Sequence, residues 1–261
     1  MLKEIIISIQ AYLHTHRFII KHRLWKWIII PGLLYAVLFC VGIYLFWISS
    51  SSAIELMLVK TGVKEWMAKL QNSWISFLLI FLQLILHLVL LLFYLSLFKY
   101  LFLIIGSPLF AYLSEKTESI IEGRDIPFNM AQFIKDVFRG IRLALRNMLW
   151  QTVYTISILI LSFIPLLGWV TPVIALAIEC YYLGFAMLDY SCERNKLSTS
   201  QSITFIGRHK GLAIGNGMVF FLMHLVPIVG WVLAPSYAVI AATISLYNTK
   251  TDNPMPGREI N

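Results

Sequence analysis

The sequence predicts an all-α integral membrane protein that forms one polytopic domain over residues 1–261. Only 13% of its residues are charged and 59% are hydrophobic, whereas a soluble domain averages about 25% charged residues. Mean hydropathy is +0.78. Uncharged runs long enough to cross a bilayer alternate with polar segments. We expect two long transmembrane helices, two helical hairpins with Pro/Gly-Trp tips, and an N-terminal amphipathic helix.

Residues 2–24 alternate apolar and polar side chains at helical spacing. One apolar stripe is expected to hold Ile5, Ile6, Ile9, Leu13 and Ile20. Three cations, Lys3, Arg17 and Lys21, fall on other faces of the same helix. This pattern is typical of an amphipathic helix that lies in the membrane interface.

Two uncharged runs predict transmembrane helices over 26–48 and 74–105. Trp25, Trp27 and Trp47 bracket the first run, as expected of aromatic residues at a membrane interface. A polar connection is expected over about 49–73. The sequence Gly106–Ser107–Pro108 should break or kink the second helix, because proline lacks a backbone N–H.

The region 107–146 is the most polar part of the chain and is expected to form cytoplasmic helices. Lys135, Arg139, Arg142 and Arg146 recur every three or four residues. They should form one basic stripe along a helix. Contact with lipid headgroups explains such a stripe, and attraction of small anions is the alternative.

An internal repeat predicts hairpins over 147–188 and 212–248, separated by a cytoplasmic joint over 189–211 and followed by a tail over 249–261. The tips are IPLLGWVTP and VPIVGWVLAP, 62 positions apart. In the tips, Pro165, Gly168 and Trp169 correspond one for one to Pro227, Gly230 and Trp231.

The two tips contain no charged residue, although a loop that emerges into water normally carries polar side chains. Backbone groups left bare in hydrocarbon cost several kcal/mol each. The tips therefore favour hairpins that stop within the membrane, buried against protein or lining a cavity. A tight turn at the far interface, with the tip tryptophan in the aromatic belt, is the alternative.

The distribution of lysine and arginine predicts the orientation. The N-terminal segment holds five, the 99–146 region seven, the 189–211 joint four and the tail two, against three in 49–73. Two crossings followed by two hairpins place the first four groups on one side, which should be cytoplasmic. We expect a multi-pass membrane protein with cytoplasmic N- and C-termini.

Motifs for enzyme catalysis, for metal binding and for a cofactor are absent from the sequence. The net charge of +8 has no accompanying nucleic-acid-binding motif, so membrane lipids are the expected partner of the basic residues. Polar side chains within apolar runs are the remaining candidates: Gln83, His87, Glu179, Asn216 and His224. Such residues line a pore or couple an ion, or they make structural hydrogen bonds inside a helix bundle.

The C-terminal half, LDYSCERNKLSTSQSITFIGRHKGLAIGNG followed by LVPIVGWVLAPSYAVIAAT, resembles the CysZ-type sulfate permease family. SPLFAYLSEKTE (Ser107–Glu118) is similar to the segment after that family's second membrane helix. Eukaryotic etoposide-induced membrane proteins of the endoplasmic reticulum share the superfamily. The resemblance implies two long membrane helices, two partly inserted hairpins, a homo-oligomer, and channel-like sulfate entry that serves cysteine synthesis.

By position, the resemblance places an anion-path element at Leu113, Ser114 and Glu115. The family's basic pair before the first membrane helix falls at Trp25 and Lys26, so tryptophan replaces one basic residue. Arg23 lies nearby as a substitute. We expect Arg23 and Lys26 to guide the anion, since paired cations attract oxyanions.

Two functions follow as hypotheses. The first is permeation of sulfate or a related small oxyanion. The second is a non-transporting membrane scaffold or envelope-homeostasis protein, in which small residues mediate helix packing. Sulfate flux into vesicles distinguishes the two.

Overall fold

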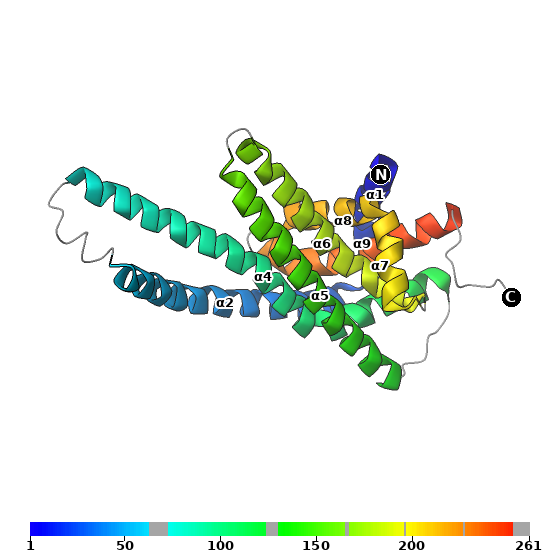
Figure 1. The fold of residues 1–261 in the computed structure, drawn as a ribbon. Coiled ribbons are helices and arrows are strands. Elements are labelled where there is room, and N and C mark those ends of the chain that lie inside the picture. The colour runs from blue at the N-terminus through cyan, green and yellow to red at the C-terminus, as the bar shows by residue number, and fades with distance from the viewer. Residues whose placement is uncertain (63–72, 124–129, 165–166, 196, 227, 253–261) are drawn as a thin grey trace. The chain divides into compact units, whose positions relative to one another are not determined.

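The computed structural model describes residues 1–62, 73–123, 130–164, 167–195, 197–226 and 228–252 (Figure 1). Within these ranges the chain forms helices and no strand. The helices are α1 (Leu2–His22), α2 (Trp25–Lys60), α4 (Ser73–Glu122), α5 (Met130–Ser162), α6 (Thr171–Arg194), α7 (Thr199–Arg208), α8 (Lys210–His224) and α9 (Val229–Asp252), with a 3₁₀ turn η1 (Leu167–Trp169).

Four helical segments are long and apolar enough to cross a membrane: Trp25–Lys60, Gln83–Glu122, Thr171–Glu193 and Val229–Thr249. They lie in α2, α4, α6 and α9. The all-α membrane fold class is therefore confirmed. Whether the hairpin arms cross or stop within the bilayer stays a prediction.

The first membrane helix is longer than the sequence suggested. Residues 49–60, expected in a polar connection, continue α2 to Lys60. Within this serine run, Ser51 and Ser52 donate their hydroxyls to the carbonyls of Trp47 and Ile48, at 3.0 and 3.1 Å. Such bonds to the preceding turn satisfy the hydroxyls within the helix itself. Residues 63–72 lie outside the described ranges.

The expected break at Gly106–Pro108 does not end the second helix, because α4 runs through Pro108 to Glu122. Proline at position 108 cannot donate to the carbonyl of Ile104, four residues earlier. The hydroxyl of Ser107 donates to that carbonyl instead, at 2.9 Å. A side-chain donor thus replaces the missing backbone bond. The basic stretch after residue 130 likewise continues without interruption into the first hairpin arm, within α5.

The chain divides into two compact units, Val37–Leu101 and the remainder, Met1–Ala36 with Phe102–Asn261. In the smaller unit, α2 and α4 meet through aromatic rings. Phe39 and Phe98 lie with ring centroids 5.8 Å apart, and Phe46 and Tyr94 lie 5.0 Å apart. Gly42 permits this approach, because a Cβ there would come within 2.6 Å of the Tyr94 hydroxyl.

The larger unit is organised around α8, which contacts α1, α6 and α9. Gly184 of α6 and Gly217 of α8 form a crossing without side chains between the backbones. A Cβ on Gly184 would overlap the carbonyl oxygen of Ala213, and one on Gly217 would overlap that of Cys180. Small residues drive helix association in membranes because they permit close van der Waals contact.

The face of α1 that packs on the protein is small and polar. Its buried residues are Ser8, Ala11, Tyr12, Thr15 and Ile19. Ser8 and Tyr12 donate hydroxyls to the carbonyls of Leu212 and Asn216, at 3.0 and 2.9 Å. The predicted apolar stripe is thus not the packing face, since Ile6, Ile9, Leu13 and Ile20 stay exposed. Gly215 allows this contact, because a Cβ there would lie 2.9 Å from the Ile5 carbonyl oxygen.

Replacing Gly184 or Gly217 with alanine should separate α6 from α8 and destabilise the protein by about 2–3 kcal/mol, as overpacking does in other cores. Cys180 is buried at this crossing, so its rate of reaction with a maleimide should rise in either variant. Gly207→Ala in α7 is the matched control, because a Cβ there meets nothing within 4 Å. Unchanged Cys180 protection in both crossing variants would contradict the close packing.

Candidate functional site

The two predicted cations Arg23 and Lys26 lie at the junction of α1 and α2. Arg23 ends α1 in the left-handed conformation, with φ of 54°. Its neighbour Leu24 is buried and donates its N–H to the carbonyl of Ile19 at 3.1 Å. The chain therefore turns sharply, and both cations are exposed beside the first turn of α2. The partial positive charge of the α2 N-terminus is opposed there by the partial negative charge of the α1 C-terminus, so the positive charge comes from the two side chains.

The α4 segment Leu113–Glu115 lies next to this junction. The ring of Trp27, directly after Lys26, contacts the ring of Tyr112 with centroids 4.5 Å apart. Glu115 is one helical turn from Tyr112 and so lies on the same side of α4. Ser114 is two residues from Tyr112 and points the opposite way. Glu115 therefore lies on the side of α4 that carries Tyr112, whereas Ser114 is turned into the interior, where Leu113 is also buried.

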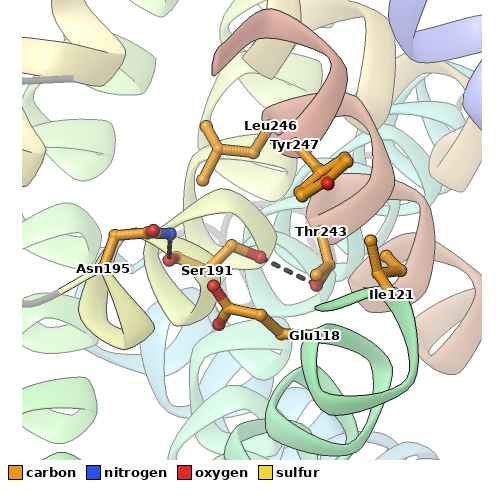
Figure 2. Close-up of a pocket in the computed structure, with 7 residues that line it drawn as sticks. All are labelled: Glu118, Ile121, Ser191, Asn195, Thr243, Leu246 and Tyr247. Carbon is orange, nitrogen blue, oxygen red and sulfur yellow. Dashed lines mark hydrogen bonds between the residues drawn. The ribbon is translucent and has the colours of Figure 1, made fainter. Parts of the chain in front are cut away.

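Ser114 belongs to a buried hydroxyl cluster with Ser191 of α6 and Thr243 of α9. The three oxygens lie 2.8–3.4 Å apart. Figure 2 shows Ser191 and Thr243 beside Glu118 and Asn195, which line a small pocket. The pocket has room for about one water molecule, which is less than a sulfate ion requires. The hydroxyl cluster therefore joins three helices through buried hydrogen bonds.

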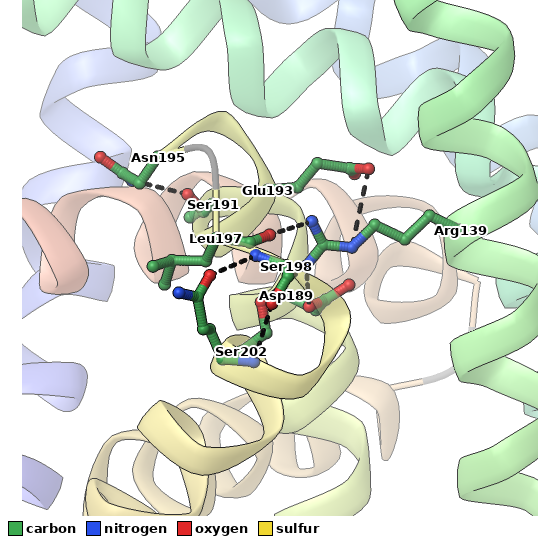
Figure 3. Close-up of polar contacts among 9 residues, drawn as sticks. Arg139, Asp189, Ser191, Glu193, Asn195, Leu197, Ser198 and Ser202 are labelled. Carbon is green, nitrogen blue, oxygen red and sulfur yellow. Dashed lines mark hydrogen bonds and ion pairs between the residues drawn. The ribbon is translucent and has the colours of Figure 1, made fainter. Parts of the chain in front are cut away.

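A buried ion-pair network joins α5, α6 and α7 (Figure 3). Its centre is Arg139, whose guanidinium donates to Asp189 at 3.0 Å, to the Leu197 carbonyl at 2.6 Å and to Ser202 at 2.6 Å. Glu193 lies 3.8 Å from Nε. The side chain of Arg139 is 15% exposed. Arg139 is therefore engaged with the protein interior and is not available to lipid headgroups or a permeating anion.

The predicted basic stripe on α5 is consequently divided. Arg146 donates to the side-chain oxygen of Asn147 at 3.0 Å and is half-buried. Lys135 and Arg142 are exposed. Helical spacing placed all four cations along one side of α5. The carboxylates of α6 decide that Arg139 is the one that pairs with the protein interior.

The intramembrane polar candidates make hydrogen bonds within the helix bundle. Glu179 of α6 accepts from Gln151 of α5 at 2.5 Å. Asn216 of α8 is fully buried and donates to the carbonyl of Ala238 in α9 at 3.1 Å. His87 bonds the Gln83 carbonyl of its own helix at 2.9 Å. Glu179 and Asn216 therefore each join the two arms of one hairpin.

The equivalent residues of the two tips have different environments. Trp169 in η1 is 89% exposed, whereas Trp231 donates its indole N–H to the His224 carbonyl at 3.1 Å. A Cβ on Gly168 would lie 2.7 Å from the Ser162 carbonyl oxygen, and one on Gly230 would overlap that of Met223. Both glycines therefore allow close backbone contacts at the turn of their own hairpin. Pro165 and Pro227 lie outside the described residues.

Sequence reasoning missed the carboxylates Asp189 and Glu193 and the amide Gln151. Asp189 and Glu193 are four residues apart on a helix, so they share a face. This spacing is the sequence signal that could have indicated two carboxylates of α6 around one cation. Gln151 gave no such signal, because a single amide in an apolar run has no preferred partner in the sequence.

Arg139→Gln should destabilise the protein by about 3 kcal/mol, because it leaves buried carboxylates without their cation. Arg142→Gln, on the same helix but exposed, should change the free energy of unfolding by less than about 0.5 kcal/mol. Unfolding in mixed micelles measures both, and a double-mutant cycle with Asp189→Asn isolates the pair. Equal effects of the two arginine substitutions would count against the network.

Comparison with known proteins gives a family for this arrangement. A sequence model of the family described as sulfate transporter CysZ/etoposide-induced protein 2.4 matches residues 11–235. The chain is 27% identical over 143 residues to a protein named sulfate transporter CysZ from Pseudomonas aeruginosa strain LESB58. Proteins of the same name from Pseudomonas fluorescens strain Pf-5 and Pseudomonas syringae pv. tomato are 27% and 26% identical.

These alignments cover 54% of the chain and 58%, 57% and 56% of the three relatives. The chain thus spans little more than half the length of the curated relatives it matches. The family match is broader and extends from α1 into α9. The chain is a multi-pass membrane protein and belongs to the sulfate transporter CysZ/etoposide-induced protein 2.4 family, a family of transporters and not of enzymes.

Proposed function

We propose that this protein passes sulfate or a related small oxyanion through the membrane, in a channel-like manner. The observation that carries the proposal is the pair of exposed cations, Arg23 and Lys26, beside the N-terminal turn of α2. The contact of Trp27 with Tyr112 brings α4 to the same place. The names of the relatives support sulfate as the anion.

The two cations and Glu115 have opposite roles in this proposal. Arg23 and Lys26 attract the dianion through the charges of their side chains. Glu115, on the side of α4 that meets Trp27, limits how tightly the anion is held. Conduction requires binding strong enough for entry and weak enough for release. Leu113 and Ser114 hold this segment of α4 in place through their burial.

The hairpins are proposed to stop within the bilayer. In the second hairpin, α8 has 15 residues and is about 22 Å long, whereas the hydrocarbon core is about 30 Å thick. The arms α6 and α9 are long enough to cross, so for them the proposal rests on the apolar tips. The described tip residues Trp169, Val226 and Ile228 are apolar and exposed, which suits lipid or a second copy of the chain. We propose a homo-oligomer in the inner membrane, with both termini cytoplasmic, whose sulfate uptake supports sulfur assimilation.

The scaffold alternative loses part of its basis. A scaffold predicts that bulky substitutions at Gly168 or Gly230 break the oligomer, but a Cβ at either position meets backbone of the same hairpin. Bulky substitutions there would disturb the hairpin whichever function is correct. Flux measurements therefore separate the two functions better than glycine substitutions do.

Purified protein in liposomes should admit radiolabelled sulfate above the rate of empty vesicles, and selenate should compete. Arg23→Gln/Lys26→Gln should lower the initial rate about tenfold, because the field of a charged entrance raises the local anion concentration by roughly that factor or more. The decrease should be largest at low ionic strength, where charges are least screened.

Lys60→Gln/Lys210→Gln removes the same charge from two exposed lysines, one at the C-terminal end of α2 and one at the start of α8. This control should retain the original rate. A folded preparation with no flux above empty vesicles would refute sulfate permeation. Equal losses in the two double variants would reject Arg23 and Lys26 as the entrance.

A further inference from the structure

One strip of α1 is apolar and is not covered by the protein. It consists of Leu2, Ile6, Ile9, Leu13 and Ile20, which are between 38% and 73% exposed. At 3.6 residues per turn these positions fall within about 60° of arc. The opposite side of the helix packs on the protein through Ser8, Thr15 and Ile19. The strip therefore faces away from α8 and α9.

Cations border this strip along one side. Lys3, Arg17 and Lys21 are exposed, and none of them pairs with a carboxylate among the residues that the structure describes. The single acidic residue of α1, Glu4, is turned to the protein. It accepts from the Gly211 N–H at 3.0 Å and contacts His209 at 2.8 Å. The outward surface of α1 is thus apolar and basic, without a compensating negative charge.

We propose that α1 lies in the headgroup layer and binds anionic phospholipid, with the strip in the acyl boundary and Lys3, Arg17 and Lys21 on the headgroups. An apolar face beside lysine and arginine is the pattern of helices that bind anionic membrane surfaces. A second copy is a poorer occupant of the strip. A symmetric contact would bring the same basic edge of both copies together, and like charges repel.

The lipid contact has a structural consequence, because α1 is joined to α8 by Ser8 and Tyr12. A helix fixed at the headgroup layer sets the depth of the hairpin formed by α8 and α9. It also places Arg23, which ends α1, in the same layer. The inference requires only that the protein resides in a membrane and does not depend on the substrate.

The first test measures lipid selectivity of the full chain. Protein equilibrated with equimolar phosphatidylglycerol and phosphatidylcholine should retain mainly phosphatidylglycerol in native mass spectrometry. Lys3→Gln/Arg17→Gln/Lys21→Gln should lower this selectivity at least about tenfold, since each cation contributes roughly fivefold near an anionic surface. Lys60→Gln/Lys116→Gln/Arg208→Gln, three exposed cations elsewhere, should leave it unchanged. Equal selectivity in the two triple variants would overturn the proposal.

The second test locates the strip with spin labels in a Cys40→Ser background, because Cys40 is exposed while Cys180 and Cys192 are buried. A label at Leu13→Cys should be reached by oxygen, which concentrates in lipid. A label at His14→Cys, the exposed neighbour toward the basic side, should be reached by a water-soluble nickel chelate. Spin–spin broadening at Leu13→Cys would show a second copy on the strip and would overturn the proposal. Neither test uses sulfate, so failure here is distinct from failure of the proposed function.

Discussion

The arrangement of the larger unit depends on how closely α8 approaches its neighbours. Three consecutive residues of α8 face three different helices: Gly215 meets α1, Asn216 bonds α9 and Gly217 crosses α6. In lipid there is little hydrophobic force between helices, so close van der Waals contact and hydrogen bonds hold them together. A side chain at either glycine would move α1 or α6, and with them the ends of the helices that carry the candidate site.

The polar residues inside this bundle serve mainly to connect helices. Arg139 joins α5 to α6 and α7, and Ser114 joins α4 to α6 and α9. Burial of such groups is tolerated because each has partners within hydrogen-bond distance. Substituting these residues would therefore impair folding, and the variants would not report on transport. This separates them from Arg23 and Lys26, whose exposure leaves them available to an anion.

The basic residues of the chain fall into three environments, although the sequence presents them as one excess of positive charge. Arg139 neutralises carboxylates in the interior. Lys3, Arg17 and Lys21 border an uncovered apolar strip on α1. Arg23 and Lys26 surround the turn between α1 and α2. The basic residues that give the net charge of +8 thus include a structural cation, cations suited to lipid headgroups, and cations at a candidate entrance for the anion.

The sequence by itself determined the membrane class, the order of the helices and the repeated tips, because uncharged runs and Pro/Gly punctuation are local properties. It misjudged the ends of α2 and α4, because α2 continues through a serine run and the Ser107 hydroxyl replaces the backbone bond that Pro108 cannot make. Only the tertiary structure decided that Arg139 pairs with Asp189, that Ser114 is buried in a hydroxyl cluster, and that the side of α1 with Ser8, Tyr12 and Thr15 packs inward. These outcomes depend on which helices become neighbours, and hydrophobic periodicity within one helix does not contain that information.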